Sequence, residues 1–176
     1  MFEEKALSEK KVFEGKCIDV STFDVLLTDG NKSYREVVKH PGGVVVVALK
    51  DEDTILMVKQ FRFPLQKELL ELPAGRLEVG ENPDDAIKRE LLEETGYEAK
   101  EWKSLGFIYT TPGICTEKLY LYMAKDLTFK EQNLDEDEFL SVYEYKLSEV
   151  LQMIKDGRIN DSKTVCALTR AFLWLN

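Results

Sequence analysis

The sequence predicts an α/β protein in which helices cover a mixed sheet, with an antiparallel β extension at its N-terminus. Three observations lead to this fold class. The chain has 176 residues, of which 44% are apolar, and this is enough for one compact core. Apolar and polar side chains alternate in several short segments, as they do in half-buried strands. Apolar residues recur at helical spacing in three other segments, and no internal repeat or linker divides the chain.

The first forty residues predict antiparallel strands. Side chains alternate between apolar and polar through residues 10–40, and Asp29-Gly30-Asn31 is typical of a turn between two such strands. We expect residues 1–40 to be a β extension of the main domain at residues 41–176, and not an independent domain.

The centre of the sheet is predicted by two apolar segments that follow. Residues 44–49 are all apolar and mostly β-branched, as expected of a strand that is covered on both faces. Residues 54–61 are expected to pair with this strand. Further elements are expected as strands at residues 104–110, 118–124 and 139–145 and as helices at residues 148–156 and 161–175.

The charge balance excludes several classes of function. Thirty-three acidic residues against 24 basic ones give a net charge of −9, which disfavours binding of nucleic acid over a broad surface. The longest apolar run, residues 42–49, is far shorter than the ~20 residues of a membrane-spanning helix. The charged N-terminal residues do not resemble a signal peptide, so a cytoplasmic protein is expected.

Cysteine and histidine are too scarce for a metal site built on them. Cys17, Cys115 and Cys166 are widely spaced, which argues against a disulfide framework or a zinc knuckle. His40 is the only histidine, so a site with several imidazoles is excluded. Chemistry in this chain must depend on carboxylates, arginines and the backbone.

One helix is predicted with clear signals at both ends. Asn82 offers a cap, Pro83 suits the first helical position, and Gly96 suits the end, which predicts a helix over residues 83–95.

This helix carries an unfavourable set of charges. Glu90, Glu93 and Glu94 stand at i, i+3 and i+4, so their carboxylates share one face, which we expect to be exposed. Like charges at this spacing cost roughly 0.2–0.5 kcal/mol a pair, and anions at a helix C-terminus oppose the helix dipole. A divalent cation with oxygen ligands would reverse this cost. The alternative is an ordinary acidic surface.

The residues around this helix form a motif. Residues 75–97 read GRLEVGENPDDAIKRELLEETGY and fit the pattern G-x5-E-x7-R-E-U-x-E-E-x-G-U, where U is apolar or bulky. The matching residues are Gly75, Glu81, Arg89, Glu90, Leu91, Glu93, Glu94, Gly96 and Tyr97. This segment resembles a complete Nudix box. The resemblance implies an α/β/α sandwich on a mixed sheet and hydrolysis of a nucleoside diphosphate that is linked to a second group.

The same resemblance implies the metal ligands. They are the side chains of Glu90, Glu93 and Glu94 and the carbonyl of Ala74, and they would hold Mg²⁺ or, as a substitute, Mn²⁺. Glu81 would pair with Arg89 and brace the loop.

Segments outside the box resemble the ADP-ribose pyrophosphatase branch of the family. Pro112 follows Gly96 by sixteen residues, and residues 34–49 and 58–75 are also similar to that branch. The resemblance implies hydrolysis of ADP-ribose to AMP and ribose 5-phosphate. Another nucleotide sugar, a dinucleoside polyphosphate or a nucleoside triphosphate remains an alternative substrate, and a non-catalytic nucleotide-sugar sensor is a remote alternative.

The branch also implies residues that bind substrate and a homodimer. Arg35 and Arg62 match arginines that bind the phosphates and terminal groups, and Arg76 is a further candidate contact. The N-terminal strands would pack against a second copy and complete its pocket.

The acidic segment 134–138 resembles a loop that closes over the site in this branch. Glu136 matches the general base and Glu138 a further metal ligand. Glu117 is the competing base and otherwise a substrate contact, whereas a solvated charge run is the plain alternative for the segment. Together with Glu94, Glu136 and Glu117 are the candidate catalytic residues.

Overall fold

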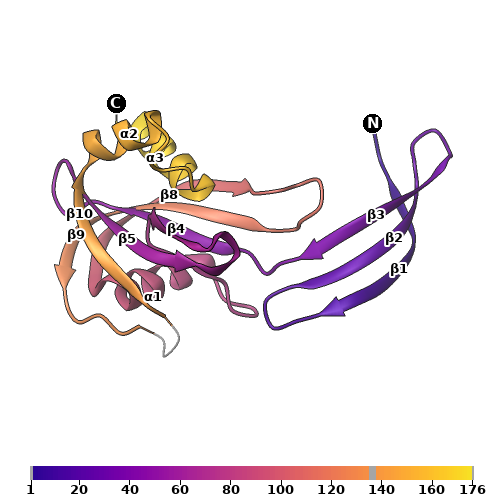
Figure 1. Cartoon of the computed structure of the whole chain (residues 1–176), viewed down its shortest axis with the longest axis horizontal. Coiled ribbons are helices and arrows are strands. Elements are labelled where there is room, and N and C mark those ends of the chain that lie inside the picture. The colour runs from indigo at the N-terminus through magenta and orange to yellow at the C-terminus, as the bar shows by residue number, and fades with distance from the viewer. Residues whose placement is uncertain (1, 135–137, 176) are drawn as a thin grey trace. The chain divides into compact units, whose positions relative to one another are not determined.

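The computed structural model describes residues 2–134 and 138–175 (Figure 1). The chain folds into two compact units. One consists of residues 1–42 and 109–118, and the other of residues 43–108 and 119–176.

The first unit is built on a three-stranded antiparallel sheet. Its strands follow in the order β1 (Lys5–Glu14), β2 (Asp19–Leu26) and β3 (Lys32–Lys39). The turn before β3 lies where the sequence predicts it, with Gly30 at φ 86°. The first strand begins earlier than expected, because half of the residues of Lys5–Glu14 are charged and all ten are exposed.

A four-stranded mixed sheet forms the centre of the second unit. The strand order is β7 (Ala74–Arg76), β4 (Gly43–Ala48), β9 (Lys118–Phe129) and β8 (Tyr97–Tyr109). β4 is parallel to β9 and antiparallel to β7, so the predicted mixed sheet is confirmed.

A second, three-stranded sheet lies in the same unit. Its order is β10 (Leu140–Lys146), β5 (Thr54–Arg62) and β6 (Lys67–Glu71), and both pairings are antiparallel. A 3-10 turn, η1 (Phe63–Leu65), joins β5 to β6.

The predicted pairing of residues 44–49 with residues 54–61 is wrong. β4 and β5 lie in different sheets, and one isolated bridge between Leu49 and Ile55 joins the segments. The prediction rested on closeness along the chain. The structure instead pairs β4 with β9, whose apolar residues support a strand buried on both faces.

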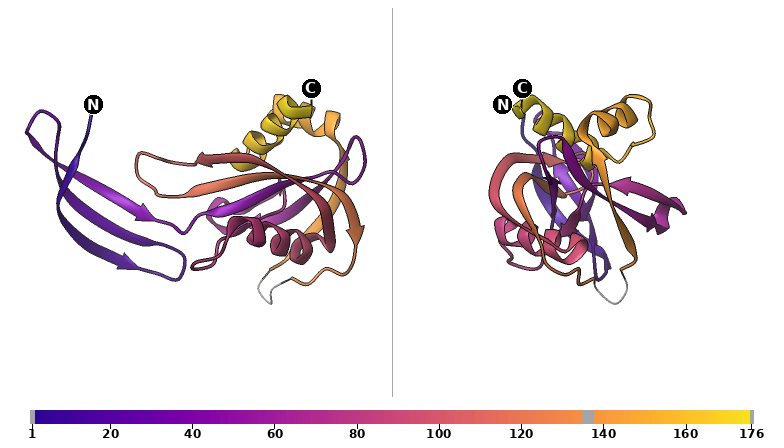
Figure 2. Two further views of the ribbon diagram at one scale, coloured as in Figure 1. Left: turned by 180° about the vertical axis from the view of Figure 1, so that it is seen from behind. Right: turned by 90° about the vertical axis from the view of Figure 1, so that its left-hand side faces the viewer.

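Helices cover both faces of β4. Val45 and Val47 belong to one buried cluster with Leu168 and Ala171 of α3 (Ser162–Leu175). The alternate side chains of β4 belong to a second cluster, with residues of α1 (Pro83–Thr95); its members include Val44, Val46, Ile87 and Leu91. Figure 2 shows α1 on one side of the strands and α3 with α2 (Leu147–Lys155) on the other. The predicted α/β/α sandwich is confirmed.

Most other predicted elements are present, and short ones were missed. The expected strands overlap β8, β9 and β10, of which β8 begins earlier and β9 ends later than predicted, and the expected helices correspond to α2 and α3. β6 and β7 had not been predicted, because each is short and interrupted by polar side chains. In the described part of the chain, no helix is long and apolar enough to cross a membrane.

Candidate active site

Helix α1 provides the platform for the site. The Asn82 side chain caps its first turn by accepting a hydrogen bond from the Asp84 N–H at 2.9 Å. At the other end Gly96 adopts φ 75°, and its N–H donates to the Leu92 carbonyl at 2.8 Å. The predicted bounds of this helix are confirmed.

Two of the three helix glutamates are buried, which corrects the expectation of an exposed face. Glu90 is 7% exposed and Glu94 3%. Burial raises the pKa of Glu90 to about 7 and that of Glu94 to about 8, and the charge of Glu138 contributes to both shifts. Glu93 is only partly buried. The face is therefore a desolvated carboxylate pair with a third carboxylate at its edge.

The backbone of β7 lies directly against these carboxylates. The Ala74 N–H donates to Oε2 of Glu94 at 2.9 Å. A Cβ at Gly75 would lie 1.8 Å from Cδ of Glu90, so only glycine leaves room for the carboxylate. This contact explains why the motif begins with a glycine. The predicted ligand role of the Ala74 carbonyl stays a prediction.

Arg89 binds three carboxylates. Its Nε and Nη2 donate to Oε1 and Oε2 of Glu81, each at 3.0 Å, which confirms the predicted pair. Its Nη1 donates to Glu90 at 2.8 Å and to Glu93 at 2.9 Å, contacts that sequence reasoning missed. The i, i+4 spacing of Arg89 and Glu93 was the available signal.

The donor set suits a hard divalent cation. In residues 2–134 and 138–175, no three His, Cys, Asp or Glu side chains are arranged to hold a metal ion, and Arg89 ties Glu90 to Glu93. The buried groups are nevertheless carboxylate oxygens, which Mg²⁺ and Mn²⁺ prefer as ligands. A cation among them would offset the repulsion between Glu90 and Glu94.

Arg62 is held by a buried carboxylate at the end of β5. Its Nε and Nη2 donate to Oε1 and Oε2 of Glu71 at 2.8 and 2.6 Å, and Glu71 is 1% exposed. Lys163 also donates to Glu71, at 2.5 Å. The charge of Glu94 also acts on Arg62. Glu71 and Lys163 were not predicted, because a lone glutamate in an apolar segment gives no specific signal.

The other described candidates in the second unit are exposed residues. Arg76 is an exposed residue at the end of β7. Glu138 is exposed, and its charge acts on Glu90 and Glu94. The predicted base Glu136 lies outside the described residues.

Arg35 and Glu117 belong to the first unit. Nε of Arg35 donates to Oε2 of Glu4 at 3.0 Å. Oε2 of Glu117 accepts a hydrogen bond from the Thr110 hydroxyl at 2.6 Å, and Nδ1 of His40 lies 3.6 Å from its Oε1. The functional roles proposed for both residues stay predictions.

Comparison with known proteins agrees with this geometry. The chain matches the NUDIX domain over residues 39–168, and it therefore belongs to that family. It is 45% identical over 168 residues to "ADP-ribose pyrophosphatase" of Bacillus subtilis (strain 168), with 94% of this chain and 91% of that protein covered, and is thus a homologue of that protein.

The chain is also similar to a second relative and to a solved structure. The chain is 47% identical over 170 residues to "Methanol dehydrogenase activator" of Bacillus methanolicus, with 96% of this chain and 92% of that protein covered. A solved structure described as an ADP compounds hydrolase shares the fold, with a TM-score of 0.87, 22% identity, and coverage of 98% of this chain and 94% of that one.

Proposed function

We propose that the chain hydrolyses the pyrophosphate bond of ADP-ribose and releases AMP and ribose 5-phosphate. The observation that carries this proposal is the buried pair Glu90 and Glu94 against the β7 backbone, in a chain 45% identical to a protein named ADP-ribose pyrophosphatase. Burial of two neighbouring carboxylates lowers the stability of a fold. Such an arrangement is expected at a functional site, and a bound cation would offset its cost.

The proposed cofactor is Mg²⁺, with Mn²⁺ as a possible substitute. Its proposed ligands are the side chains of Glu90, Glu93, Glu94 and Glu138 and the carbonyl of Ala74. When bound, the cation would neutralise charge on the pyrophosphate and ease deprotonation of the attacking water.

Fixed arginines would hold the phosphates in a protein whose net charge is −9. Arg62 is the first proposed contact in the second unit, because Glu71 fixes two of its nitrogens and the charge of Glu94 acts on it. Arg76 and Arg35 are the further proposed contacts.

In the proposed reaction a carboxylate removes a proton from water, the water oxygen bonds to one phosphorus, and the bridging P–O bond breaks. Glu117 and Glu136 are the two candidate bases. The hydrogen bond from Thr110 orients the Glu117 carboxylate. Comparison of Glu117→Gln with Glu136→Gln identifies the base, because loss of it should lower kcat by roughly 10²–10⁴.

A substrate panel tests the proposal. The wild-type chain with Mg²⁺ is incubated with ADP-ribose, ADP-glucose, NADH, diadenosine polyphosphates and deoxynucleoside triphosphates. We expect ADP-ribose to give the highest kcat/KM. A higher value for another compound in the panel would assign the site to that substrate instead.

We also propose a cytoplasmic homodimer in which residues 1–40 form the contact. All ten residues of β1 are exposed, and β1 is an edge of its sheet. An exposed edge strand favours pairing with a second chain. The three cysteines, all of them described, form no disulfide, which suits a reducing compartment.

Activation of a methanol dehydrogenase is a second candidate function. It is favoured by the 47% identity to a protein of that name. Methanol oxidation by purified methanol dehydrogenase, measured with and without the chain, tests this candidate. An unchanged rate would remove it and leave the hydrolase proposal intact.

A further inference from the structure

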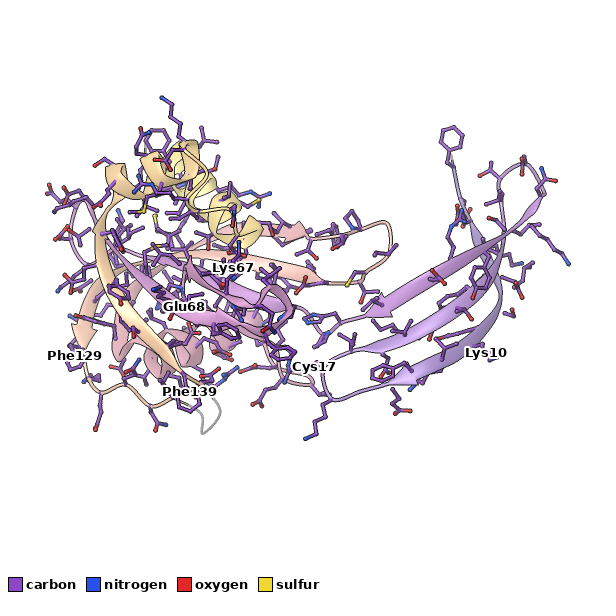
Figure 3. The ribbon with its side chains drawn as sticks, viewed as in Figure 1. Lys10, Cys17, Lys67, Glu68, Phe129 and Phe139 are labelled. Carbon is purple, nitrogen blue, oxygen red and sulfur yellow. The ribbon has the colours of Figure 1, made fainter. Side chains whose placement is uncertain are left out.

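The end of strand β6 is held by the start of helix α3. β6 begins at Lys67 and Glu68, both labelled in Figure 3, and ends at Glu71, which is 1% exposed. The Leu72 N–H, next along the chain, donates a hydrogen bond to the Thr164 hydroxyl of α3 at 3.0 Å. Both of these residues are fully buried, so α3 fixes the backbone directly after Glu71.

A second contact joins α3 to the Glu71 side chain. Nζ of Lys163 donates to Oε2 of Glu71 at 2.5 Å, and the Lys163 side chain is mostly buried. The same Nζ donates to Oδ2 of Asp161 at 3.0 Å. A buried carboxylate is costly for a fold unless it is paired and hydrogen-bonded, and Lys163 supplies one of the two cationic partners of Glu71.

Arg62 is the other cationic partner of Glu71. Its Nε and Nη2 donate to Oε1 and Oε2 at 2.8 and 2.6 Å, so Oε2 of Glu71 accepts hydrogen bonds from both Arg62 and Lys163. Unlike the side chains of Glu71 and Lys163, that of Arg62 is 37% exposed. Glu71 therefore fixes one edge of the guanidinium, and the exposed part of the group can still bind an anion.

The formal charges of this cluster cancel. Arg62 and Lys163 are cations, and Glu71 and Asp161 are anions paired with them. Without Lys163 the cluster would carry a net negative charge beside the arginine proposed to bind phosphates, in a protein whose net charge is already −9. That charge would repel a pyrophosphate and oppose its attraction to Arg62.

We infer that Lys163 is a positioning residue for substrate binding: it holds Glu71, which in turn orients the guanidinium of Arg62 for the phosphates. Lys163 itself does not contact the substrate. This inference rests on the proposed function, because it assumes that Arg62 binds the phosphates. It gives the start of α3, which lies outside the Nudix box, a part in forming the site.

Steady-state kinetics with ADP-ribose and Mg²⁺ test the inference. Lys163→Met keeps a long side chain but removes the charge and the donor. We expect KM to rise about 10-fold, as when one charge-assisted hydrogen bond is weakened, while kcat stays within about twofold. A role in stability alone would lower the amount of active protein, and so the apparent kcat, at an unchanged KM. Lys155→Met removes the same charge from an exposed position on α2 and should leave both constants unchanged.

Three further variants complete the test. Lys163→Arg retains a point charge at this position and should keep KM within about threefold of wild type. Lys163→Gln, which keeps a donor without the charge, replaces Lys163→Met if melting shows that the methionine variant is unfolded at the assay temperature, and it should also raise KM. In a Glu71→Gln background, Lys163→Met should raise KM little further, because the carboxylate through which Lys163 acts is gone.

Three results would overturn the inference and leave the proposed function in place. They are an unchanged KM in the folded Lys163 variant, a KM in Lys163→Arg as high as in Lys163→Met, and a full effect of Lys163→Met in the Glu71→Gln background. The last result would show that Lys163 contacts the substrate itself. A wild-type chain that does not hydrolyse ADP-ribose would overturn both the inference and the proposed function.

Discussion

Glu94 is 3% exposed, and its carboxylate accepts a hydrogen bond from the Ala74 N–H, so it is the most enclosed of the three helix glutamates. Helical spacing places its carboxylate beside those of Glu90 and Glu93, and the motif implies a role for all three. Its burial could not be predicted, because the covering strand β7 has three residues and no pattern of its own. The contact of Arg89 with Glu93 was likewise hidden by the stronger signal of its pairing with Glu81.

Glu94→Gln should make the stability of the metal-free protein depend less on pH. Burial raises the pKa of Glu94 from 4.5 to about 8, so between these values the folded state binds a proton that the unfolded state has lost. The free energy of unfolding of the metal-free protein should therefore fall as the pH rises from about 5 to 8. Glutamine cannot titrate, so the variant should melt at the same temperature as wild type or higher at pH 8. Its free energy of unfolding should also decrease less over this pH range than that of wild type.

Thermal melts of both proteins in the presence of a chelator, from about pH 5 to pH 8, measure this pH dependence. Glu52→Gln, an exposed position between β4 and β5, is the matched control and should follow wild type. A Glu94→Gln variant that melts clearly lower than wild type at pH 8 would contradict the burial argument.

Gly75→Ala gives the second prediction. The new Cβ would lie 1.8 Å from Cδ of Glu90, so either the side chain or the β7 backbone must move. We expect a loss of about 1–3 kcal/mol in the free energy of unfolding, as for other overpacked sites. Urea unfolding measures it, with Gly113→Ala as the control, because nothing lies within 4 Å of a Cβ there. Equal stability of the two variants would show that Gly75 is not a steric requirement.

The boundaries of helix α1 were more predictable than the partners of strand β4. Helix α1 was predicted to the residue, because its cap, its proline and its final glycine are all local signals. The strands that pair with β4 were not predicted, because several apolar segments could pair with it and β9 lies some seventy residues away along the chain. Parallel strands are not joined by a tight turn, so no turn residues in the sequence mark which strands pair.

The Asp161 carboxylate stabilises the start of α3. Oδ2 of Asp161 accepts hydrogen bonds from the Thr164 N–H at 3.0 Å and from Lys163 at 3.0 Å. Burial opposes ionisation, but Lys163 and Thr164 outweigh it and lower the pKa of Asp161 below 3.8. The resulting stability is present above the ordinary aspartate pKa and is lost as the pH falls through the lower folded value.

Asp161→Asn keeps an acceptor but removes the charge. At pH 7 we expect the variant to unfold with about 1–3 kcal/mol less free energy than wild type, and we expect the gap to shrink below pH 4, roughly. Urea unfolding at pH 7 and at pH 3 tests both statements. Asp156→Asn, in a surface ion pair with Arg158, should change little at either pH. A stability difference between Asp161→Asn and wild type that is larger at pH 3 than at pH 7 would contradict the predicted direction of the pH dependence.

The exposure of the N-terminal sheet is not explained by a single chain. Three antiparallel strands need an apolar face or a packed partner to be stable. β1 offers only exposed side chains, among them Val12 at 51%. A dimer accounts for the exposure of this strand, and light scattering should give about 41 kDa, twice the 20.3 kDa of the chain.

A charged residue on the edge strand should weaken the dimer. Val12→Lys should shift the mass toward 20.3 kDa at micromolar concentration, whereas Phe2→Lys, before the strand begins, should not. A wild-type mass of 20.3 kDa throughout that range, with undiminished activity, would exclude the dimer.

We propose that the buried glutamates of α1 support cation-dependent hydrolysis of ADP-ribose. The most direct measurement follows AMP and ribose 5-phosphate released from ADP-ribose by wild type and by Glu94→Gln, with Mg²⁺ and with a chelator. We expect wild type with Mg²⁺ to release equal amounts of the two products. Most turnover should be lost when the chelator is present, and also in the folded Glu94→Gln variant. Undiminished turnover by Glu94→Gln at moderate Mg²⁺, or by wild type in the chelator, would contradict it.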